Sequence, residues 1–290
     1  MAFPLGRIEE IQKKPDNFRL LERVPWTQEG VSFPYDVSAP VGDEVPVLFL
    51  DHETTGFDHE NDAIIELGMV KALVSPSTGQ VATLISVTSL YNDPGFPIPE
   101  VITDITGITD AMVSGQTIET DDILDWFSDD PIVVAHNASF DRPFFDEQFP
   151  ALDRLRWACS QQDVPWREMG FESAKLEYLL LKRGYFYDGH RAATDCLALA
   201  FLLTNVNKAS RALFANESKV QYQVKAWGSP FNCKDALKSR GYRWAPEEKV
   251  WHTMVKEDDL RDELEALSLL YSSGGERAEI IKLTSRDRYR

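Results

Sequence analysis

Two carboxylates follow a short apolar run in the segment Val47–Gly56. Asp51 and Glu53 come directly after four residues of Val, Leu and Phe, a composition that predicts a buried strand. Because side chains alternate along a strand, Asp51 and Glu53 point to the same face. Two carboxylates on one face of a core strand repel each other and are costly to bury, and a divalent cation with oxygen ligands relieves both costs. The segment therefore predicts a metal site.

Two further acids and a histidine occur in segments that could join this site. Asp141 ends a polar segment that follows a predicted strand, and Asp195 comes five residues after His190. Residues five apart lie on different faces of a helix, so His190 must precede the Asp195 helix to serve the same site. Four carboxylates can hold two Mg²⁺ or Mn²⁺ ions, and His titrates in the range that a general base needs. Taken singly, the two acids are better explained as helix caps or solvated positions, and His190 is compatible with an ordinary loop residue.

The elements that must position these residues alternate between strands and helices. We predict strands at residues 47–51, 63–73, 81–91 and 131–135, of which the first three have short links and form an antiparallel meander. Predicted helices span residues 120–127, 175–183 and 192–203, and another helix follows Asp141. Strands followed by alternating helices and strands indicate a mixed α/β fold, in which helices pack against a sheet.

The composition excludes several classes of protein. With 290 residues and 43% hydrophobic residues, the chain can fill the cores of one medium domain and one smaller domain. No apolar run reaches the roughly 18 residues that a membrane span needs, and the N-terminus lacks the features of a signal peptide. The three separated cysteines, Cys159, Cys196 and Cys233, fit neither a disulfide framework nor a zinc ribbon. We therefore predict a cytoplasmic protein with no membrane partner.

Charge is unevenly distributed along the chain. The net charge is −17, but residues 206–290 carry 16 basic and 13 acidic residues, whereas residues 1–205 carry 14 basic and 34 acidic residues. A strongly acidic body argues against nucleic-acid binding unless bound cations offset the charge locally. The excess of acid therefore coincides with the part of the chain that contains the predicted metal site.

Four segments resemble, in order, the motifs of the DnaQ-like 3′–5′ exonucleases of the DEDDh type. They are Asp51–Gly56, Ile105–Ile108, His136–Asp141 and His190–Asp195. The resemblance covers roughly residues 45–205 and rests on all four segments occurring together at suitable spacing. It implies a ribonuclease-H-like fold, with a mixed sheet flanked by helices. It also implies an enzyme that releases 5′-mononucleotides from the 3′ end of a nucleic acid.

The resemblance also assigns roles to individual residues. It implies that Asp51, Glu53, Asp141 and Asp195 bind two divalent cations, Mg²⁺ or Mn²⁺, and that His190 is the general base. Residues expected to hold the terminal nucleotides or line the cleft are Thr54, Thr55, Gly56, Phe57, Ile105, Thr106, Gly107, Ile108, His136, Asn137 and Phe140. One departure is His52, where the family more often has Thr or an apolar residue. Because His52 points to the face opposite the two acids, we expect it to have little effect on metal binding.

Segments of different character flank the exonuclease-like part, residues 45–205. Residues 1–44 contain several prolines and no steady period, and we interpret them as a surface extension anchored by Trp26 and Phe33. Residues 206–290 restart the pattern in the order βαββαβ, which fits a small ferredoxin-like unit. Aromatic and basic residues of this unit, such as Trp244 and Lys249, are compatible with a small core or with a surface that stacks on nucleic acid. We interpret the arginine-rich end, residues 286–290, as disordered.

The sequence therefore predicts a phosphodiester hydrolase that acts on nucleic acid with a free 3′ end, with DNA favoured over RNA. A polymerase or a repair complex is a further expected partner, because the chain contains no polymerase domain of its own. Two alternatives stay open. One is an exoribonuclease that trims RNA, since nothing in the sequence identifies a contact to a 2′-hydroxyl. The other is a scaffold that binds nucleic-acid ends or recruits a polymerase with little turnover, because the acidic body repels DNA.

Overall fold

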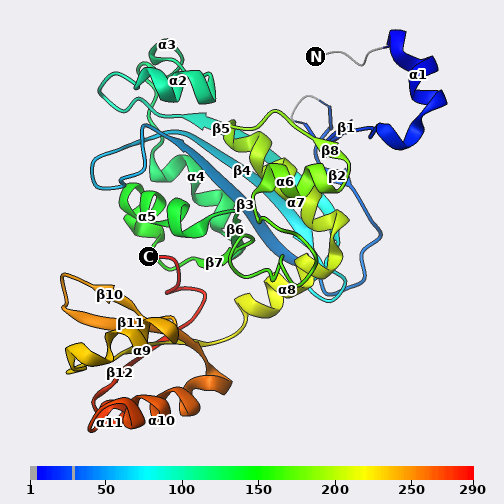
Figure 1. Ribbon diagram of the computed structural model, residues 1–290. Coiled ribbons are helices and arrows are strands. Elements are labelled where there is room, and N and C mark those ends of the chain that lie inside the picture. The colour runs from blue at the N-terminus through cyan, green and yellow to red at the C-terminus, as the bar shows by residue number, and fades with distance from the viewer. Residues whose placement is uncertain (1–4, 28–29) are drawn as a thin grey trace.

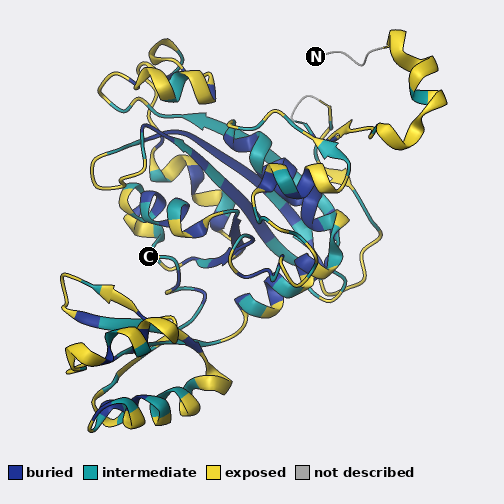
Figure 2. Ribbon diagram, viewed as in Figure 1, coloured by how far each residue is buried: buried dark blue, intermediate teal, exposed yellow. Residues whose placement is uncertain are grey.

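A computed structural model describes residues 5–27 and 30–290 and contains two main sheets of different size (Figure 1). Most residues of the central strands in the larger sheet are buried, whereas the smaller sheet and the N-terminal extension are more exposed (Figure 2). Within the described ranges, no helix combines the length and the apolar character that a bilayer crossing requires. The larger sheet carries the candidate site.

The larger sheet has six strands. These are β2 (Tyr35–Asp36), β3 (Val45–Thr54), β4 (Ile64–Val74), β5 (Val81–Tyr91), β6 (Ile132–Ala135) and β7 (Arg156–Cys159). They lie in the order β2-β5-β4-β3-β6-β7. The pairs β5–β4 and β4–β3 are antiparallel, whereas β6 runs parallel to β3 and to β7. The predicted antiparallel meander is confirmed, and β7 has no counterpart among the predicted strands.

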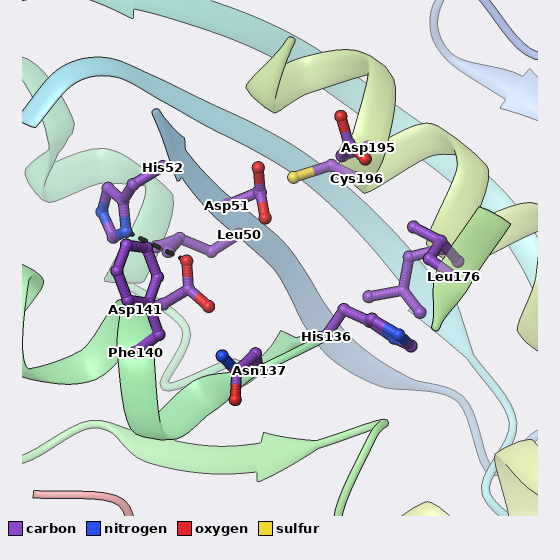
Figure 3. A pocket seen from close by; sticks show the side chains of 11 residues that line it. Leu50, Asp51, His52, His136, Asn137, Phe140, Asp141, Leu176, Asp195 and Cys196 are labelled. Carbon is purple, nitrogen blue, oxygen red and sulfur yellow. Dashed lines mark hydrogen bonds and ion pairs between the residues drawn. The ribbon is translucent and has the colours of Figure 1, made fainter. Parts of the chain in front are cut away.

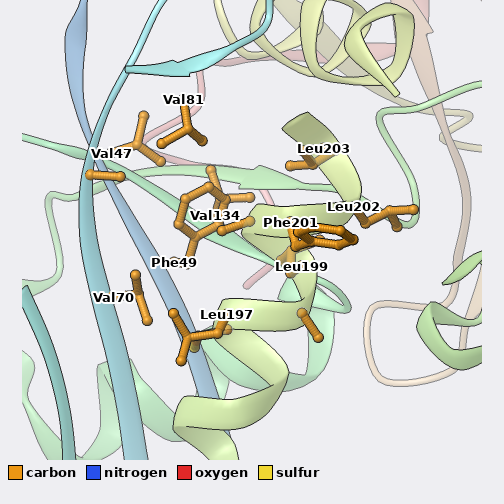
Figure 4. Packing of buried hydrophobic residues seen from close by; sticks show 14 of the residues in the cluster. Val47, Phe49, Val70, Val81, Val134, Leu197, Leu199, Phe201, Leu202 and Leu203 are labelled. Atoms are coloured by element: carbon orange, nitrogen blue, oxygen red, sulfur yellow. The ribbon is translucent and has the colours of Figure 1, made fainter. Parts of the chain in front are cut away.

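Helices cover both faces of this sheet, so the predicted mixed α/β fold class is confirmed. On one face lie α4 (Thr120–Phe127) and α5 (Ala138–Gln148). On the other lie α6 (Leu176–Lys182), α7 (Ala192–Asn205) and α8 (Asn207–Glu217). Successive residues of β3 enter alternate cores. Leu48 lies in the core on the α5 side, and Phe49 lies in the core on the α7 side (Figure 4). The side chains on both faces of such a strand lie in apolar cores, which explains the uninterrupted apolar run before Asp51.

The parallel pairing of β3 with β6 determines where polar residues can gather. Val47 pairs with Ile132 and Phe49 with Val134, so the two strands end at the same edge of the sheet. Because α5 begins three residues after β6 ends, the first turns of α5 lie at the edge reached by the end of β3. Three elements distant in sequence therefore meet there once α7 packs across β3 and β4.

Further segments extend this core at both ends. Between β5 and α4, α2 (Glu100–Thr106) and α3 (Asp110–Val113) form a lobe that projects from the sheet (Figure 1). At the N-terminus, α1 (Ile8–Lys13) is followed by β1 (Glu22–Arg23), which pairs with β8 (Tyr185–Phe186). The predicted anchors Trp26 and Phe33 pack against the α7-side core, and the Trp26 ring meets the Phe201 ring edge-on at 5.3 Å. The extension is therefore fixed to α7.

The smaller sheet has the predicted βαββαβ order. Its elements are β9 (Gln221–Lys225), α9 (Lys234–Ser239), β10 (Arg243–Ala245), β11 (Val250–Lys256), α10 (Leu260–Leu270) and β12 (Glu279–Leu283), with the short α11 (Gly274–Arg277) before β12. The strands lie in the order β10-β11-β9-β12, and all neighbours are antiparallel. Tyr242 belongs to the core of this sheet, whereas Trp244 is about half-exposed. Of these two aromatic residues, Trp244 is therefore open to a ligand and Tyr242 is not.

The C-terminal residues after β12 return to the larger sheet, and the chain ends beside α5 (Figure 1). The Trp157 amide of the edge strand β7 donates to the Ser285 carbonyl at 2.9 Å. The fully buried Arg142 guanidinium of α5 donates to the carbonyls of Arg286 and Arg288, each at 2.6 Å. The interpretation of this end as disordered is therefore wrong, because buried donors of the larger sheet and its helices bind its backbone.

The two chain segments that link the sheets lie side by side. The Ser285 hydroxyl donates to the Glu217 carboxylate at the end of α8 at 2.7 Å, and the Arg288 guanidinium donates to the Glu217 carbonyl at 2.7 Å. Helix α8 itself packs into the core on the α7 side. The smaller sheet is thus inserted between two segments that belong structurally to the larger one.

Candidate active site

Three carboxylates converge at the edge where β3 ends. Asp51 and Glu53 extend from β3, and Asp195 extends from the first turn of α7. One oxygen from each of the three side chains lies within 4.8 Å of the others. Figure 3 shows the side chains of Asp51 and Asp195 facing the same space between β3 and α7. The alternation predicted for Asp51 and Glu53 is therefore observed in the structure.

A glycine opposite Asp51 permits this approach. Gly68 of β4 pairs in register with Asp51, and a Cβ atom at position 68 would lie 2.2 Å from the Ala192 carbonyl carbon and 2.3 Å from the Ala193 nitrogen. No side chain fits in that space, so the first turn of α7 packs directly on the strand backbone. Asp195 is thereby brought over Asp51.

Asp141 reaches the same pocket from the opposite face of the sheet. It lies on α5 and is 2% exposed. A pocket of about 150 Å³ is lined by Asp51, Asp141 and Asp195 together (Figure 3). This volume is too small for a nucleotide but accommodates ions and their water ligands. Asp141 is not one of the three carboxylates within 4.8 Å, so the four predicted ligands form a group of three and one neighbour.

The Asp141 side chain contacts His52. The His52 Nδ1 atom lies 3.3 Å from Asp141 Oδ1, and both side chains are almost completely buried. His52 therefore contacts one of the predicted metal ligands, whereas the expectation that it has little effect on metal binding stays a prediction. Its side chain does point away from Asp51 and Glu53, but α5 covers that face of the strand and places Asp141 against it.

Burial and mutual repulsion disfavour the charged forms of these acids. The pKa of Asp51 is raised well above its usual value by burial and by the nearby charges of Asp141 and Asp195. The pKa of Glu53 is raised to about 8, mainly by burial and then by repulsion from Asp195. Burial also raises the pKa of Asp195, although a hydrogen bond from the Tyr187 hydroxyl at 2.8 Å partly opposes this effect.

The donors of this site fit a hard divalent cation. Carboxylate oxygens are preferred ligands of Mg²⁺ and Mn²⁺, and the site offers no thiolate ligand because burial raises the pKa of the Cys196 thiol well above its usual value. A bound cation would favour the ionised forms of Asp51 and Glu53 that burial disfavours. The residues present therefore suit a divalent metal ion, as exonucleases of this type use.

His190 lies in the loop immediately before α7, as its spacing from Asp195 predicted. Its backbone is left-handed, with φ of 64°, and its side chain is exposed. The exposed ring is accessible to water, and His190 offsets part of the rise in the pKa of Asp195 that burial causes. Tyr187, which sequence reasoning missed, comes three residues earlier and bonds Asp195 directly. In the sequence, the only feature that indicated Tyr187 was its position as a polar residue shortly before the segment His190–Asp195.

The Thr-Thr-Gly segment forms a closed turn at the rim of the site. The Thr54 hydroxyl donates to the Gly56 carbonyl at 2.6 Å, and the Thr55 hydroxyl donates to the Asp62 carboxylate at 3.0 Å. A Cβ atom at Gly56 would collide with this carboxylate at 2.3 Å, which explains the glycine. Phe57 follows the turn and is 88% exposed.

The segment Ile105–Ile108 lies at the end of α2. Ile105 is half-exposed, whereas Ile108 is completely buried in the small core of the projecting lobe. Thr106 is buried and accepts a hydrogen bond from the Ile108 amide at 3.0 Å. Gly107 caps the helix with a left-handed backbone, φ 72°. The side chain of this segment that is open to a ligand is therefore Ile105.

The segment after β6 contributes the wall of the pocket. His136, Asn137 and Phe140 all line it (Figure 3). Both ring nitrogens of His136 are engaged, with Ser160 Oγ at 2.8 Å and the Ala174 carbonyl at 2.7 Å. Burial lowers the pKa of His136 to about 4, so its ring is neutral and fixed. Asn137 is exposed and keeps its side-chain amide available.

A fifth acid beside the site, the buried Glu66 on β4, was also missed. Its carboxylate accepts hydrogen bonds from the Arg191 guanidinium at 3.0 and 3.1 Å, from the Ala192 amide at 3.1 Å and from the Ser89 hydroxyl. This ion pair joins β4 to the start of α7. The acid within the apolar first half of the predicted strand 63–73 was a signal for a buried partner.

Known proteins resemble the part of the chain that contains these residues. A family model described as Exonuclease (RNase_T) matches residues 48–203. DNA polymerase III PolC-type of Bacillus subtilis (strain 168) is 30% identical over 204 residues, which are 67% of this chain and 13% of that protein. The PolC-type polymerase of Listeria monocytogenes serovar 1/2a is 35% identical over 196 residues, 64% of this chain and 13% of that protein. The chain thus spans about an eighth of the length of these curated relatives.

Two solved structures are similar to a little over half of this chain. Exonuclease X in complex with 5′ overhanging duplex DNA has 26% identity and a TM-score of 0.44, covering 55% of this chain and 90% of that one. The nuclease domain of 3′hExo, a DEDDh family member bound to rAMP, has 19% identity and a TM-score of 0.45, covering 57% and 92%. The family match includes all four segments on which the resemblance rested, and it confirms that resemblance. Because the match extends over more than half of its residues, the chain belongs to the exonuclease family.

Proposed function

We propose that this chain is a metal-dependent 3′–5′ exonuclease that releases 5′-mononucleotides, with DNA as its favoured substrate. The observation that carries the proposal is the convergence of Asp51, Glu53 and Asp195 within 4.8 Å at the edge of the sheet. Membership of the exonuclease family supports the reaction class. The preference for DNA is supported by the similarity to DNA polymerases, which also makes a polymerase a candidate partner.

Each residue of the site has a part in this proposal. Two divalent cations, Mg²⁺ or Mn²⁺, would polarise the scissile phosphodiester and lower the pKa of the attacking water. Asp51, Glu53 and Asp195 would hold them, with Asp141 completing the set from α5. His190 would accept the proton of the water at a ring nitrogen. Its exposed position lets the proton pass on to solvent.

The rim of the pocket offers surfaces for the last bases of a strand. The exposed Phe57 ring lies edge-on to Phe140, with ring centroids 6.1 Å apart. Aromatic side chains beside a nuclease site can stack on bases without reading their sequence. We propose that these two rings separate or stack the terminal nucleotides, and that Thr54, Thr55 and Ile105 bound the space for the last one.

The test is digestion of 3′-labelled oligonucleotides. Single-stranded DNA, duplex DNA, single-stranded RNA and duplex RNA would be incubated with Mg²⁺ or Mn²⁺, and single-nucleotide release would be followed. We expect release from DNA by the wild-type protein and none by Asp51→Ala. Asp58→Ala, an exposed acid just beyond the turn, is the matched control and should digest normally. Equal digestion by Asp51→Ala and wild type would overturn the proposal, and faster digestion of RNA would assign an exoribonuclease.

A scaffold is the second candidate function, and the acidic composition of residues 1–205 favours it. A protein that binds nucleic-acid ends or a polymerase would retain affinity without turnover. Binding of a 3′ end in the same panel, measured by fluorescence anisotropy with Mn²⁺ present and with no release of nucleotide, would select this candidate over the enzyme.

We also propose that residues 45–217 form the exonuclease domain, preceded by an extension, and that the smaller sheet is an accessory nucleic-acid anchor. Helix α8 is included because it packs into the larger core. The half-exposed Trp244 and the Lys238 ammonium over the Trp251 ring, 5.9 Å from its centroid, support the anchor role. Its test replaces residues 219–283 by a short Gly-Ser linker and keeps the C-terminal residues, because Glu217 and Ser285 already touch. Loss of processivity with retained single-nucleotide release is expected, and unchanged processivity would contradict the role.

A further inference from the structure

His52 is a buried polar residue for which the proposed chemistry has no role. Its side chain is 0% exposed and lies on the α5 side of β3, with its ring centroid 6.1 Å from that of Phe145. Among the described residues, its Nε2 atom has no hydrogen-bond partner. Burying an imidazole among aromatic rings is unfavourable unless its polar atoms are used. The one contact that uses them is with Asp141.

The contact has a defined direction. His52 Nδ1 lies 3.3 Å from Asp141 Oδ1, and an ionised carboxylate can only accept a hydrogen bond. In the metal-ligand role proposed for Asp141 the carboxylate is ionised, so we assign the proton of the His52 ring to Nδ1 and the lone pair to Nε2. Nε2 is then an acceptor without a hydrogen-bond partner among the described residues.

Asp141 depends on this donor for its orientation. No other side chain within the described part of the chain hydrogen-bonds its carboxylate. Asp141 comes from α5, whereas the other three acids come from β3 and α7, so nothing in the backbone of β3 fixes its distance from them. His52 is adjacent in sequence to both Asp51 and Glu53 and thus ties the Asp141 carboxylate to the strand that carries them.

We propose that His52 is a positioning residue for Asp141, whose Nδ1–H group holds that carboxylate where it can bind a second divalent cation beside the three-carboxylate group. The proposal rests on the proposed function, because it assigns a ligand role to Asp141. A hydrogen-bonded partner behind a ligand fixes the orientation of that ligand, and its removal typically weakens metal binding by about 10–100-fold.

The experiment measures Mn²⁺ binding to the full chain without nucleic acid, by electron paramagnetic resonance titration. The variants are His52→Asn, His52→Gln and His52→Leu. The Asn amide nitrogen is placed near the position of Nδ1, whereas the Gln amide nitrogen reaches toward the position of Nε2. We expect two ions on the wild type, retained binding of both in His52→Asn, and a second ion weakened about 10–100-fold in His52→Gln and His52→Leu.

Thermal unfolding of the metal-free proteins separates positioning from packing. A purely structural role predicts that Mn²⁺ affinity falls in step with the unfolding temperature and that Asn and Gln behave alike. That result would overturn the proposal, as would wild-type affinity for both ions in His52→Leu. If His52→Leu fails to fold, the difference between Asn and Gln decides. A wild-type protein that binds no Mn²⁺ or releases no nucleotide would instead refute the proposed function, so the two failures are distinguishable.

Discussion

Glu53 and Glu66 lie opposite each other on paired strands, but the surroundings of their carboxylates differ. The two residues are partners in the register of β3 and β4. Glu66 is 1% exposed and receives hydrogen bonds from Arg191, Ala192 and Ser89. No hydrogen bond to the Glu53 carboxylate is found in the described part of the chain, and burial raises its pKa to about 8.

The comparison shows how one sheet edge supports both structure and chemistry. The Glu66 carboxylate is compensated by protein groups and joins β4 to α7, which brings Asp195 into place. The Glu53 carboxylate lies among other acids and is left for a ligand that the chain does not itself supply. An acid that the fold satisfies is structural, whereas an acid that the fold leaves unsatisfied is a candidate ligand.

Glu53→Gln should separate activity from stability. Loss of a metal ligand should reduce nucleotide release more than about 100-fold, since even the partners behind ligands cost 10–100-fold. The metal-free variant should unfold at the same or a higher temperature, because the folded protein no longer contains a carboxyl group whose pKa burial raises to about 8. Nucleotide release and thermal unfolding in EDTA are the two measurements. A large fall in unfolding temperature would show that Glu53 is structural after all.

Glu66→Gln should show the reverse pattern. Removing one partner of a buried ion pair costs 3–5 kcal/mol, but the Arg191 side chain is 41% exposed and water can replace part of the loss. We therefore expect the free energy of unfolding to fall by about 2 kcal/mol. Urea denaturation measures it, with Glu60→Gln, an exposed glutamate, as the control for loss of one charge. An unchanged free energy of unfolding would indicate that Glu66 is a candidate metal ligand and not a structural residue.

The stability of the metal-free protein should fall as the pH rises from 6 to 8. The pKa of Glu53 is about 8 in the folded state against an ordinary 4.5, so between these values the folded state holds a proton that the unfolded state has released. Stability then decreases with pH, by up to about 2 kcal/mol over this interval. Urea denaturation in EDTA at pH 6 and at pH 8 tests this prediction. The decrease should shrink in Glu53→Gln and with saturating Mg²⁺, and an equal slope in all three cases would contradict the assignment.

Tyr187→Phe should have the smallest effect. Its hydroxyl donates to Asp195 at 2.8 Å, so its removal frees one ligand without changing the charge of the site. We expect Mn²⁺ affinity to fall by about tenfold, at the lower end of the range for partners behind ligands. Tyr185→Phe, two residues away, is the matched control because its ring packs on Phe201. Equal effects of both changes would indicate packing rather than support of Asp195.

Local sequence was sufficient for much of this architecture. The apolar run before Asp51 fixed a strand buried on both faces, and strict alternation placed Asp51 and Glu53 together. The spacing of His190 and Asp195 required a loop followed by a helix, and both are observed. These are properties of one strand or one helix turn, which depend on neighbours in the chain and therefore can be read from it.

Tertiary packing decided the rest. His52 faces away from the acids of its own strand, and only the position of α5 shows that it meets Asp141 there. The arginine-rich end has the composition of a free tail, but buried donors on β7 and α5 bind its backbone. Whether a buried acid becomes a structural ion pair or a metal ligand depends on which distant donors the fold brings to it. Sequence spacing alone does not determine those donors, because side-chain electrostatics inside a protein act between elements that are far apart in the chain.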